Sequence, residues 1–383
     1  MQETYMKYQS MKKPVLVAAA ALLATGAMLS SAVHAADKKL QVYLSMSYIG
    51  NDWQAEAANM VKALAAHKNF ADKVDLKVQV AGPNAQRQIQ QINAMVQQGA
   101  QAIVVYPISP TALNAAVKNA CDKGVFVIAY DAVITEPCAY NVTIDQEEAG
   151  RVTAEWLVKK LGGKGNVVVI NGVPGTSVDT ARTKAAKEVF AKYPNLKVVN
   201  EANGMWSQAV ARTELSKILA TRNWSQIDGL WMQVGCYTAN TMQLEAGAKP
   251  ADLKPCAGEG SNGGRIQMLP AGTVVDGANG TYAPMGAPRI SYASPPYSGA
   301  YALKLAVQKL EGKEIPKNAK LPLPLVTNDT VKYCKEGTWA EMKAGCNAFA
   351  PAVVSNPGWF ASIFSEQMPE IGLSAALVGQ PEQ

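Results

Sequence analysis

The feature that most constrains the fold is a regular alternation of short apolar runs with longer amphipathic segments. The runs at residues 102–106 and 125–130 are apolar throughout, which is typical of strands whose sheet is covered on both faces. Residues 84–98, which precede the first of these runs, carry Ile, Met and Val at helical spacing. Residues 111–123 form a further predicted helix between the two runs. The alternation predicts a parallel sheet with helices on both faces.

The alternation occurs twice along the chain. The first series has strands at 40–44, 74–80, 102–106 and 125–130. The second has helices at 147–161, 178–192, 207–221, 238–246 and 298–310, with strands at 166–170, 196–200, 229–233 and near Cys256, a Gly-rich loop at 258–264, and β-like runs at 273–278 and 288–293. We predict an α/β protein of two similar doubly wound, Rossmann-like lobes, followed by a C-terminal extension of about 70 residues that periodicity does not place.

The first 35 residues have the pattern of an export signal. Lys7, Lys12 and Lys13 precede an apolar stretch at residues 14–29, and Val33 and Ala35 fit the small-residue rule for cleavage after Ala35. The apolar stretch is short for a membrane span, which leaves an uncleaved membrane anchor as the alternative interpretation. We expect an exported protein that is free of the membrane, with its signal peptide removed near Ala35.

Six cysteines follow the signal segment, and an even number behind an export signal points to disulfides. They are Cys121, Cys138, Cys236, Cys256, Cys334 and Cys346. Six cysteines allow 15 pairings, of which the sequential one is favoured because each consecutive pair brackets a single local unit. Each closure would stabilise the fold by roughly 3 kcal/mol; buried free thiols are the alternative. No spacing is CxxC, so no metal site is predicted.

Composition and missing motifs exclude several classes of function. The net charge of +6 is mild and includes no basic run, so nucleic acid is not an expected partner. The two histidines are His34 and His67, and no GxSxG or GK[ST] sequence is present, so neither a catalytic triad nor a phosphate-binding loop is indicated. We predict a protein that is not an enzyme and has no cofactor. An exported hydrolase using a pair of carboxylates is the least favoured alternative.

Polar and aromatic residues follow several predicted strands, at the edge where open α/β sheets bind ligands. Ser47, Asn51, Asp52 and Trp53 follow the first strand, Asp131 follows the strand at 125–130, Arg182 lies after Gly172–Ser177, and Trp206 follows the strand at 196–200. Carboxylate and guanidinium groups can each make paired hydrogen bonds to neighbouring hydroxyls. The two indoles would stack on the C–H face of a sugar or on a planar heterocycle.

These residues give the chain a resemblance to the type I, ribose-binding-protein-like periplasmic substrate-binding proteins of sugar ABC transporters. The resemblance covers residues 40–312 and is carried by Ser47–Trp53, by 102–131 ending in Asp131, by Gly175-Thr-Ser with Arg182, and by Met205-Trp206. It implies that Ser47, Asn51, Trp53, Asp131, Arg182 and Trp206 occupy positions used by sugar binders, and that Glu259 lies in a loop that supplies an Asp in the family.

The chain departs from the family pattern at several of those positions. Ala132 stands where an arginine is common, Val234-Gly235-Cys236 replaces an Asn-Asp pair, and residues 292–294 replace a Gln. The resemblance also implies three crossings between lobes, near 141–145, 291–296 and 324–329. The expected domains are therefore residues 37–143 plus 293–325 for the N-terminal lobe, and 144–292 plus 326–383 for the C-terminal lobe with the tail.

The predicted function is capture of a small polar ligand by lobe closure, with delivery to the membrane permease of an ABC importer. A sugar or polyol is the favoured ligand, bound by Asp131 and Arg182, with Asn51 and Glu259 assisting and Trp53 and Trp206 stacking on it. We expect the protein to act as a monomer. Two alternatives stay open: a purine, nucleoside or signal molecule as the ligand, and a sensor that feeds a chemoreceptor.

Overall fold

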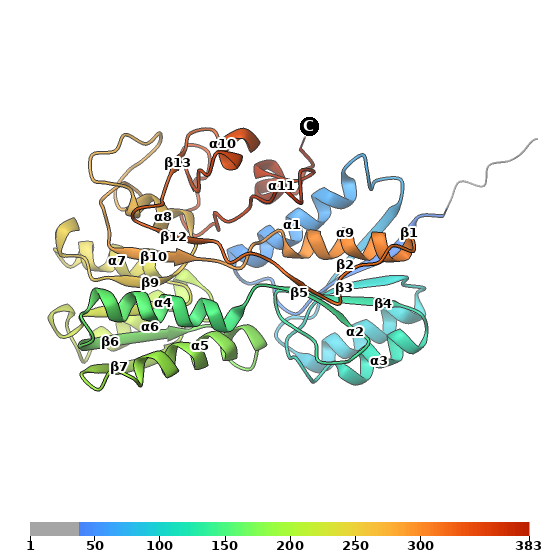
Figure 1. Cartoon of the computed structure of the whole chain (residues 1–383), viewed down its shortest axis with the longest axis horizontal. Helices are drawn as coiled ribbons and strands as arrows, with labels where there is room; N and C mark the ends of the chain where they lie inside the picture. Colours follow the sequence, from blue (N-terminus) through green and yellow to red (C-terminus); the bar gives the residue numbers. More distant parts are fainter. Residues whose placement is uncertain (1–37, 383) are drawn as a thin grey trace, which may run out of the picture. The chain divides into compact units, whose positions relative to one another are not determined.

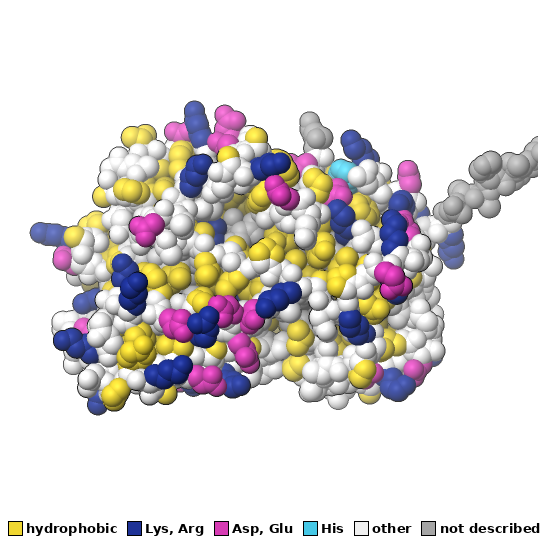
Figure 2. All heavy atoms as spheres, viewed as in Figure 1, with side chains coloured by type: hydrophobic (Ala, Val, Ile, Leu, Met, Phe, Trp, Pro, Cys, Tyr) yellow, Lys and Arg dark blue, Asp and Glu magenta, His cyan; other side chains and the backbone are white. Residues whose placement is uncertain are grey.

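Two six-stranded sheets form the framework of residues 38–382, the part of the chain that this computed structural model describes (Figure 1). The predicted signal segment lies outside the described residues. Within residues 38–382, none of the helices is long and apolar enough to span a bilayer. On the face shown in Figure 2, basic and acidic side chains are interspersed.

The first sheet has the strand order β2-β1-β3-β4-β5-β11, and all its pairings are parallel. Its strands are β1 Leu40–Met46, β2 Val74–Val80, β3 Ala102–Tyr106, β4 Phe126–Tyr130, β5 Tyr140–Thr143 and β11 Asn318–Lys320. Helices α1 Asp52–Ala66 and α9 Ser298–Leu310 share one apolar cluster with Leu44 and Met46. Helices α2 Ala85–Gln97 and α3 Asn114–Asp122 share another with Tyr43. Successive residues of β1 thus face opposite helical layers.

The second sheet repeats this arrangement with the order β7-β6-β8-β9-β10-β12, in which β12 is antiparallel to β10. Its strands are β6 Gly165–Asn171, β7 Leu196–Asn203, β8 Gly229–Met232, β9 Cys256–Glu259, β10 Arg289–Tyr292 and β12 Leu325–Thr327. Val167 and Val169 pack with helices α4 Gln146–Lys160 and α5 Ser177–Phe190. Val168 and Ile170 pack with α6 Gln208–Leu219 and α7 Cys236–Glu245. The two doubly wound parallel-sheet lobes expected from the sequence are confirmed.

The chain passes from one sheet to the other at three places within the described residues. Residues 144–145 join β5 to α4, residues 293–297 join β10 to α9, and residues 321–324 join β11 to β12. These crossings lie in or beside the three segments expected from the sequence. They bring the carboxyl ends of strands from both sheets toward a common region, because parallel strands of one sheet end at the same edge.

The tail after residue 330 contacts elements of both sheets. It contains β13 Tyr333–Cys334, α10 Trp339–Lys343, β14 Ala348–Phe349 and α11 Leu373–Val378. The Asn59 side chain of α1 donates to the carbonyls of Ala376 and Leu377 at 3.3 Å. On the other side, the Asn262 amide of α8 Asn262–Met268 donates to the Phe349 carbonyl at 2.8 Å. Periodicity did not predict these elements, since each is short and is held by contacts distant in sequence.

Two local expectations were wrong. Residues 273–278, expected to be β-like, form turns, and the expected Gly-rich loop at 258–264 is the end of β9 followed by the first turn of α8. The glycines there permit close packing, because a Cβ at Gly258 would overlap the Met232 carbonyl and one at Gly264 would overlap the Arg289 guanidinium. The remaining short helical turns are Trp224–Gln226 and Pro250–Asp252.

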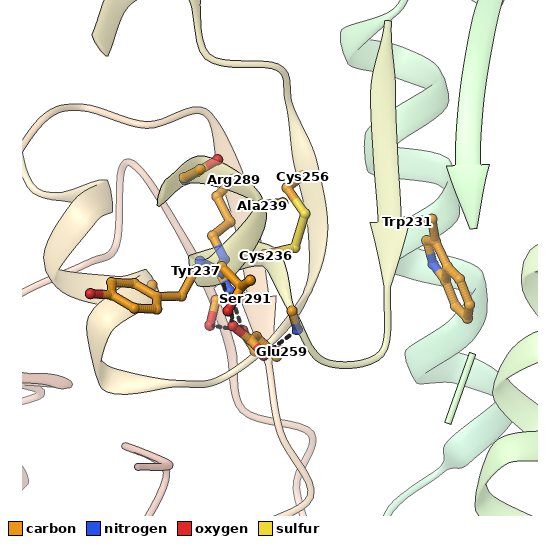
Figure 3. The surroundings of a disulfide bond; sticks show 12 residues. Trp231, Cys236, Tyr237, Ala239, Cys256, Glu259, Arg289 and Ser291 are labelled. Carbon is orange, nitrogen blue, oxygen red and sulfur yellow. Dashed lines mark hydrogen bonds and ion pairs between the residues drawn. A yellow bond between two sulfur atoms is a disulfide. The ribbon is translucent and has the colours of Figure 1, made fainter. Parts of the chain in front are cut away.

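The sequential disulfide pairing is confirmed. Cys121 pairs with Cys138, Cys236 with Cys256, and Cys334 with Cys346. Figure 3 shows the second pair, which ties the start of α7 to the start of β9 beside Glu259 and Arg289. Each bond closes a loop of 12 to 20 residues inside one structural unit.

Candidate functional site

A pocket lies where the carboxyl ends of strands from both sheets meet. The first lobe contributes Asn51, Trp53, Gln54, Tyr106 and Asp131; the second contributes Val178, Arg182, Trp206, Gln233 and Val234; the end of β10 and the crossing after it contribute Tyr292, Ala293 and Ser294; the tail contributes Phe360. Five of the eight binding residues expected from the sequence therefore line one pocket: Asn51, Trp53, Asp131, Arg182 and Trp206.

The loop after β1 positions Asn51 and Trp53 at the start of α1. Asn51 is the N-cap, and its side-chain oxygen accepts from the backbone N–H of Gln54 at 2.9 Å, which leaves its amide N–H groups available to a ligand. The Trp53 indole donates to the Ser294 carbonyl at 2.7 Å. Tyr106 and Tyr130 lie behind the indole, with ring centroids 5.8 and 6.4 Å away. The Trp53 ring is thus fixed by a hydrogen bond and by aromatic packing.

Asp131 ends β4 with a left-handed backbone, φ = 57°, a region that few non-glycine residues adopt. Its backbone is held by neighbours, since the Thr143 hydroxyl donates to its carbonyl at 2.6 Å. Its carboxylate accepts from the Gln146 amide at 3.0 Å. Burial raises the pKa of Asp131, while Arg182, Ser294 and Gln146 act in the opposite direction. A carboxylate has about four acceptor positions, so Asp131 can accept from ligand hydroxyls in addition to Gln146.

Arg182 lies in the second turn of α5 and is nearly fully buried. Its guanidinium donates to the Gln146 side-chain oxygen and to the Ser294 hydroxyl, both at 2.8 Å, and lies 5.0 Å from the centroid of the Tyr292 ring. Gln146 therefore bridges Asp131 and Arg182, donating to one and accepting from the other. The ion pairs within 4.0 Å among the described residues do not include one between Asp131 and Arg182. Both charged groups can therefore still bind a ligand.

Trp206 follows β7, and it too has a left-handed backbone, φ = 51°. Its indole donates to the Gln233 side-chain oxygen at 2.9 Å, and the Gln233 amide donates to Asp179 at 2.8 Å. The ring lies directly on Gly172, where an added Cβ would overlap the indole. The second aromatic wall is thus positioned by a hydrogen-bond chain and by a glycine.

Three residues expected to bind ligand do not line the pocket. Ser47 is fully buried at the end of β1. Asp52 faces the tail and accepts from the Asn356 amide at 2.9 Å. Glu259 has no exposed surface on its side chain and pairs with Arg289 at 3.0 Å. Asp52 and Glu259 are held by partners distant in sequence, Asn356 and Arg289, which their positions in the sequence do not reveal.

Several residues that line the pocket or hold its charged groups were not expected from the sequence. Tyr106 and Gln233 end the strands at 102–106 and 229–233, so the same strand-end argument could have found them. Ser294 falls in a predicted crossing and Gln146 directly follows another, so their proximity to both lobes carried a signal. Phe360 lies in the tail and had none, because no periodic pattern places that segment.

The pocket is small in this conformation. Its enclosed space is about 40 Å³, within a hollow of about 400 Å³ that includes its opening. Pockets for small molecules are typically roughly 300–1,000 Å³. A sugar-sized guest therefore requires the lobes or the lining side chains to move apart. Elsewhere in residues 38–382, no group of three or more His, Cys, Asp or Glu side chains gathers as a metal site.

The chain matches the family described as periplasmic binding protein domain over residues 42–314. A xylitol-binding protein of Mycolicibacterium smegmatis is 31% identical over 164 residues, which are 43% of this chain and 47% of the relative. The galactofuranose-binding protein YtfQ of Escherichia coli is 27% identical over 187 residues, 47% of this chain and 58% of the relative. The chain thus spans about half the length of these curated relatives.

Solved structures resemble the fold over a greater length. An ABC transporter solute binding protein from Thermobispora bispora has a TM-score of 0.66 and 25% identity, and the match covers 90% of this chain and 98% of the other. A Caulobacter myo-inositol binding protein has a TM-score of 0.65 and 23% identity, covering 77% and 95%. The second, at this identity, is evidence for the fold alone.

Proposed function

This chain belongs to the periplasmic binding protein family, and we propose on that premise that it captures a sugar or polyol between its two lobes and delivers it to the permease of an ABC importer. The observation that carries this proposal is the composition of the pocket. Two indoles from different lobes, Trp53 and Trp206, line it together with one buried carboxylate and one buried guanidinium.

These groups suit a polyhydroxylated molecule. The indoles can contact the C–H face of a sugar ring or polyol chain. The Asp131 carboxylate accepts from hydroxyls, the Arg182 guanidinium donates to their oxygens, and the Asn51 amide donates as well. One anionic and one cationic group favour a neutral ligand, because a net charge on the ligand would leave one of them facing a like charge. The names of the xylitol- and galactofuranose-binding relatives support this class.

Binding would proceed by movement of the lobes about the three crossings. We assign residues 37–143 plus 293–325 to the N-terminal lobe and 144–292 plus 326–383 to the C-terminal lobe, with the tail contacting both. A ligand shifts the equilibrium only through its higher affinity for the closed form. A change from 1:99 to 99:1 in favour of closure needs about 5.5 kcal/mol, which two aromatic contacts and several buried charge-assisted hydrogen bonds can supply.

The family implies a periplasmic location, and we propose export with cleavage after Ala35. The charged, apolar and small-residue regions of the first 35 residues support this. Intact-mass analysis of the protein recovered from the periplasm should give a chain that begins at Ala36, six hydrogens lighter than the fully reduced form because of the three disulfides. A mass that retains residues 1–35 would contradict it.

The ligand class is tested by a thermal-shift screen of the mature protein against pentoses, hexoses, furanoses, polyols and nucleosides, followed by calorimetry on each hit. A ligand at 100 times its Kd stabilises the folded state by about 2.7 kcal/mol. We expect saturable stabilisation by at least one sugar or polyol and its loss in Trp206→Ala. Stabilisation by nucleosides alone would overturn the sugar assignment, and sugar binding that Trp206→Ala leaves unchanged would overturn the site.

A further inference from the structure

A second cavity, which shares no lining residue with the first, lies between two of the crossings and the tail. It measures about 230 Å³. Its walls include Pro295 and Tyr297 from the crossing after β10, Pro322 and Pro324 from the crossing after β11, and Arg265 from α8. Phe364 and Ser362 are among the tail residues that complete it. The lining is largely apolar, and Arg265 is the charged residue in it.

Arg265 is buried without a counter-ion. Only 1% of its surface is exposed, and no ion pair joins it to any acidic side chain of residues 38–382. Its guanidinium donates to three neutral acceptors: the Ser291 hydroxyl at 3.2 Å, the Asn347 carbonyl at 3.0 Å and the Ser362 hydroxyl at 2.6 Å. A guanidinium carries five N–H donors, so part of its donor capacity is unused.

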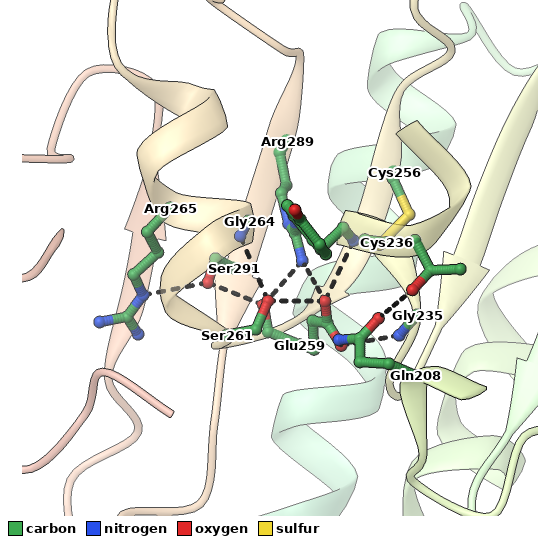
Figure 4. A network of polar contacts seen from close by, with 12 residues as sticks. Gln208, Gly235, Cys236, Cys256, Glu259, Ser261, Gly264, Arg265, Arg289 and Ser291 are labelled. Carbon is green, nitrogen blue, oxygen red and sulfur yellow. Dashed lines mark hydrogen bonds and ion pairs between the residues drawn. A yellow bond between two sulfur atoms is a disulfide. The ribbon is translucent and has the colours of Figure 1, made fainter. Parts of the chain in front are cut away.

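The nearby Glu259 carboxylate does not pair with Arg265, because other donors already bind it. It pairs with Arg289 at 3.0 Å and accepts from Gln208, from Ser261 and from the backbone N–H groups of Gly235 and Tyr237. Figure 4 shows the Arg265 guanidinium directed away from this network, with Ser291 between them. The group of Glu259, Arg289 and Arg265 thus has two buried positive charges and one negative charge.

The excess positive charge acts on Arg265 itself. Burial, together with the neighbouring Arg289, lowers the pKa of Arg265 to about 9. Arg265 is still cationic at neutral pH, but its charged form is held at a cost, since a buried charge without a partner is strongly unfavourable. An anion placed in the cavity would relieve that cost.

We propose that this cavity binds a small monocarboxylic acid with a compact apolar body. The planar guanidinium matches a carboxylate in geometry and charge, and among residues 38–382 it is the single cation that lines the cavity. The apolar part of the acid would lie against Tyr297, Pro322 and Phe364. The volume of about 230 Å³ limits the body to a short alkyl chain or a single ring. The cavity and the first pocket share no lining residue, so the acid would bind independently of the sugar or polyol.

The test uses the mature protein without sugar. Sodium acetate, butyrate and benzoate are titrated at constant ionic strength against sodium chloride, with thermal shift and calorimetry as readouts. We expect saturable stabilisation by butyrate or benzoate beyond that by chloride. Arg265→Gln should weaken binding at least tenfold, whereas Arg87→Gln, which removes one exposed positive charge on α2, should leave it unchanged.

A second variant keeps the proposal testable if Arg265→Gln does not fold. Pro322 is exposed at the rim of the cavity, so Pro322→Trp should narrow the cavity without disturbing Arg265, and it should abolish butyrate or benzoate binding. The proposal is overturned if no carboxylate binds more tightly than chloride. It is equally overturned if Pro322→Trp binds as the parent does, or if xylitol or another sugar ligand displaces the acid competitively.

Discussion

At the scale of single residues, the backbone is left-handed where it leaves the carboxyl ends of two strands. Among the described non-glycine residues, positive φ occurs at Asp131, Met205 and Trp206. Such conformations cost of order 1–3 kcal/mol each and persist where surrounding contacts enforce them. Here Thr143 holds the Asp131 carbonyl, and Gln233 holds the Trp206 indole. The local strain thus accompanies two of the side chains that we propose bind the ligand.

Gly172→Ala should weaken ligand binding through Trp206. The new methyl group would overlap the indole, so the ring must leave its place; losing an aromatic anchor costs about 2 kcal/mol or more, roughly thirtyfold in Kd. Calorimetry on folded protein checks this. In a Trp206→Ala background the same substitution should have little further effect on Kd, because the ring it displaces is gone. An additive effect in the double variant would contradict the mechanism.

Lowering the pH should weaken ligand binding. The loss of affinity should begin at a higher pH than it would with an ordinary aspartate. Burial raises the pKa of Asp131 above the usual value near 3.9, and binding requires the carboxylate, so affinity is lost as pH falls through the raised pKa. The stability of the free protein responds in the opposite sense. The folded state binds this proton more tightly than the unfolded chain does, so acidification removes a cost.

Asp131→Asn tests this assignment. We expect binding at neutral pH to weaken roughly tenfold to a hundredfold, as for loss of a hydrogen bond to a charged group. The decrease in affinity from pH 7 toward pH 4 should also disappear. Calorimetry across that range measures both. If the variant keeps the parent's pH profile, then another group controls it.

The sequence predicted several residues that line the pocket, but it did not predict the contacts that hold them in place. Asn51, Trp53, Asp131, Arg182 and Trp206 all line it, because residues just past parallel strands share one edge. The sequence could not reveal that Glu259 is held by Arg289, since that contact joins residues 30 positions apart across two strands. Nor could it reveal that Ser294 and Gln146 connect the charged pair.

At the scale of elements, prediction succeeded where a segment's own pattern determines its structure. Helix α9 was expected at 298–310 and spans Ser298–Leu310, and apolar runs located the central strands. Residues 273–278, expected to be β-like, contain turns and pair with no strand of the described residues. The tail elements are two to six residues long, too short to carry a period.

Gly150→Ala should disturb the packing of two helices and, through it, the site. A Cβ there would overlap the Arg182 carbonyl, so α5 must shift away from α4. We expect a loss of about 1–3 kcal/mol in the free energy of unfolding together with weaker ligand binding, since Arg182 moves with α5. Chemical denaturation and calorimetry measure these. Lys159→Ala, an exposed change on α4, is the control and should alter neither quantity; full retention of affinity in Gly150→Ala would argue against the coupling.

Removal of the first disulfide should affect stability and spare binding. Neither Cys121 nor Cys138 lines the pocket. The loop that they close contains Asp131, but hydrogen bonds from Thr143 and Gln146 hold that residue in place. Replacing both cysteines by serine should lower the free energy of unfolding by roughly 3 kcal/mol. Ligand Kd should change less than twofold. Denaturation curves with and without ligand separate the two effects, and a large change in Kd would indicate that this unit contributes to the site.

At the scale of the whole molecule, ligand binding should compact the protein. A ligand can reach the pocket between the lobes only when they move apart about the three crossings, so the free protein must populate an open form. Bound ligand then shifts the equilibrium toward the closed form. Small-angle scattering of the mature protein should show a smaller radius of gyration with saturating ligand than without it. Trp206→Ala at the same ligand concentration is the control and should keep the larger value. Identical scattering profiles for the parent with and without ligand would contradict closure.

The pairing of the tail with helix α1 has a consequence for how the finished protein is made. Phe360 lines the pocket, and its backbone N–H donates to the Glu56 carboxylate, a contact between residues 304 positions apart. Contacts of such separation form late in folding, because a long loop must close first. Nascent or clipped chains that lack this segment would lack one wall of the pocket, even though every strand of both six-stranded sheets precedes it in the sequence. Ligand binding would then be a property of full-length chains only, acquired after most of their secondary structure has formed.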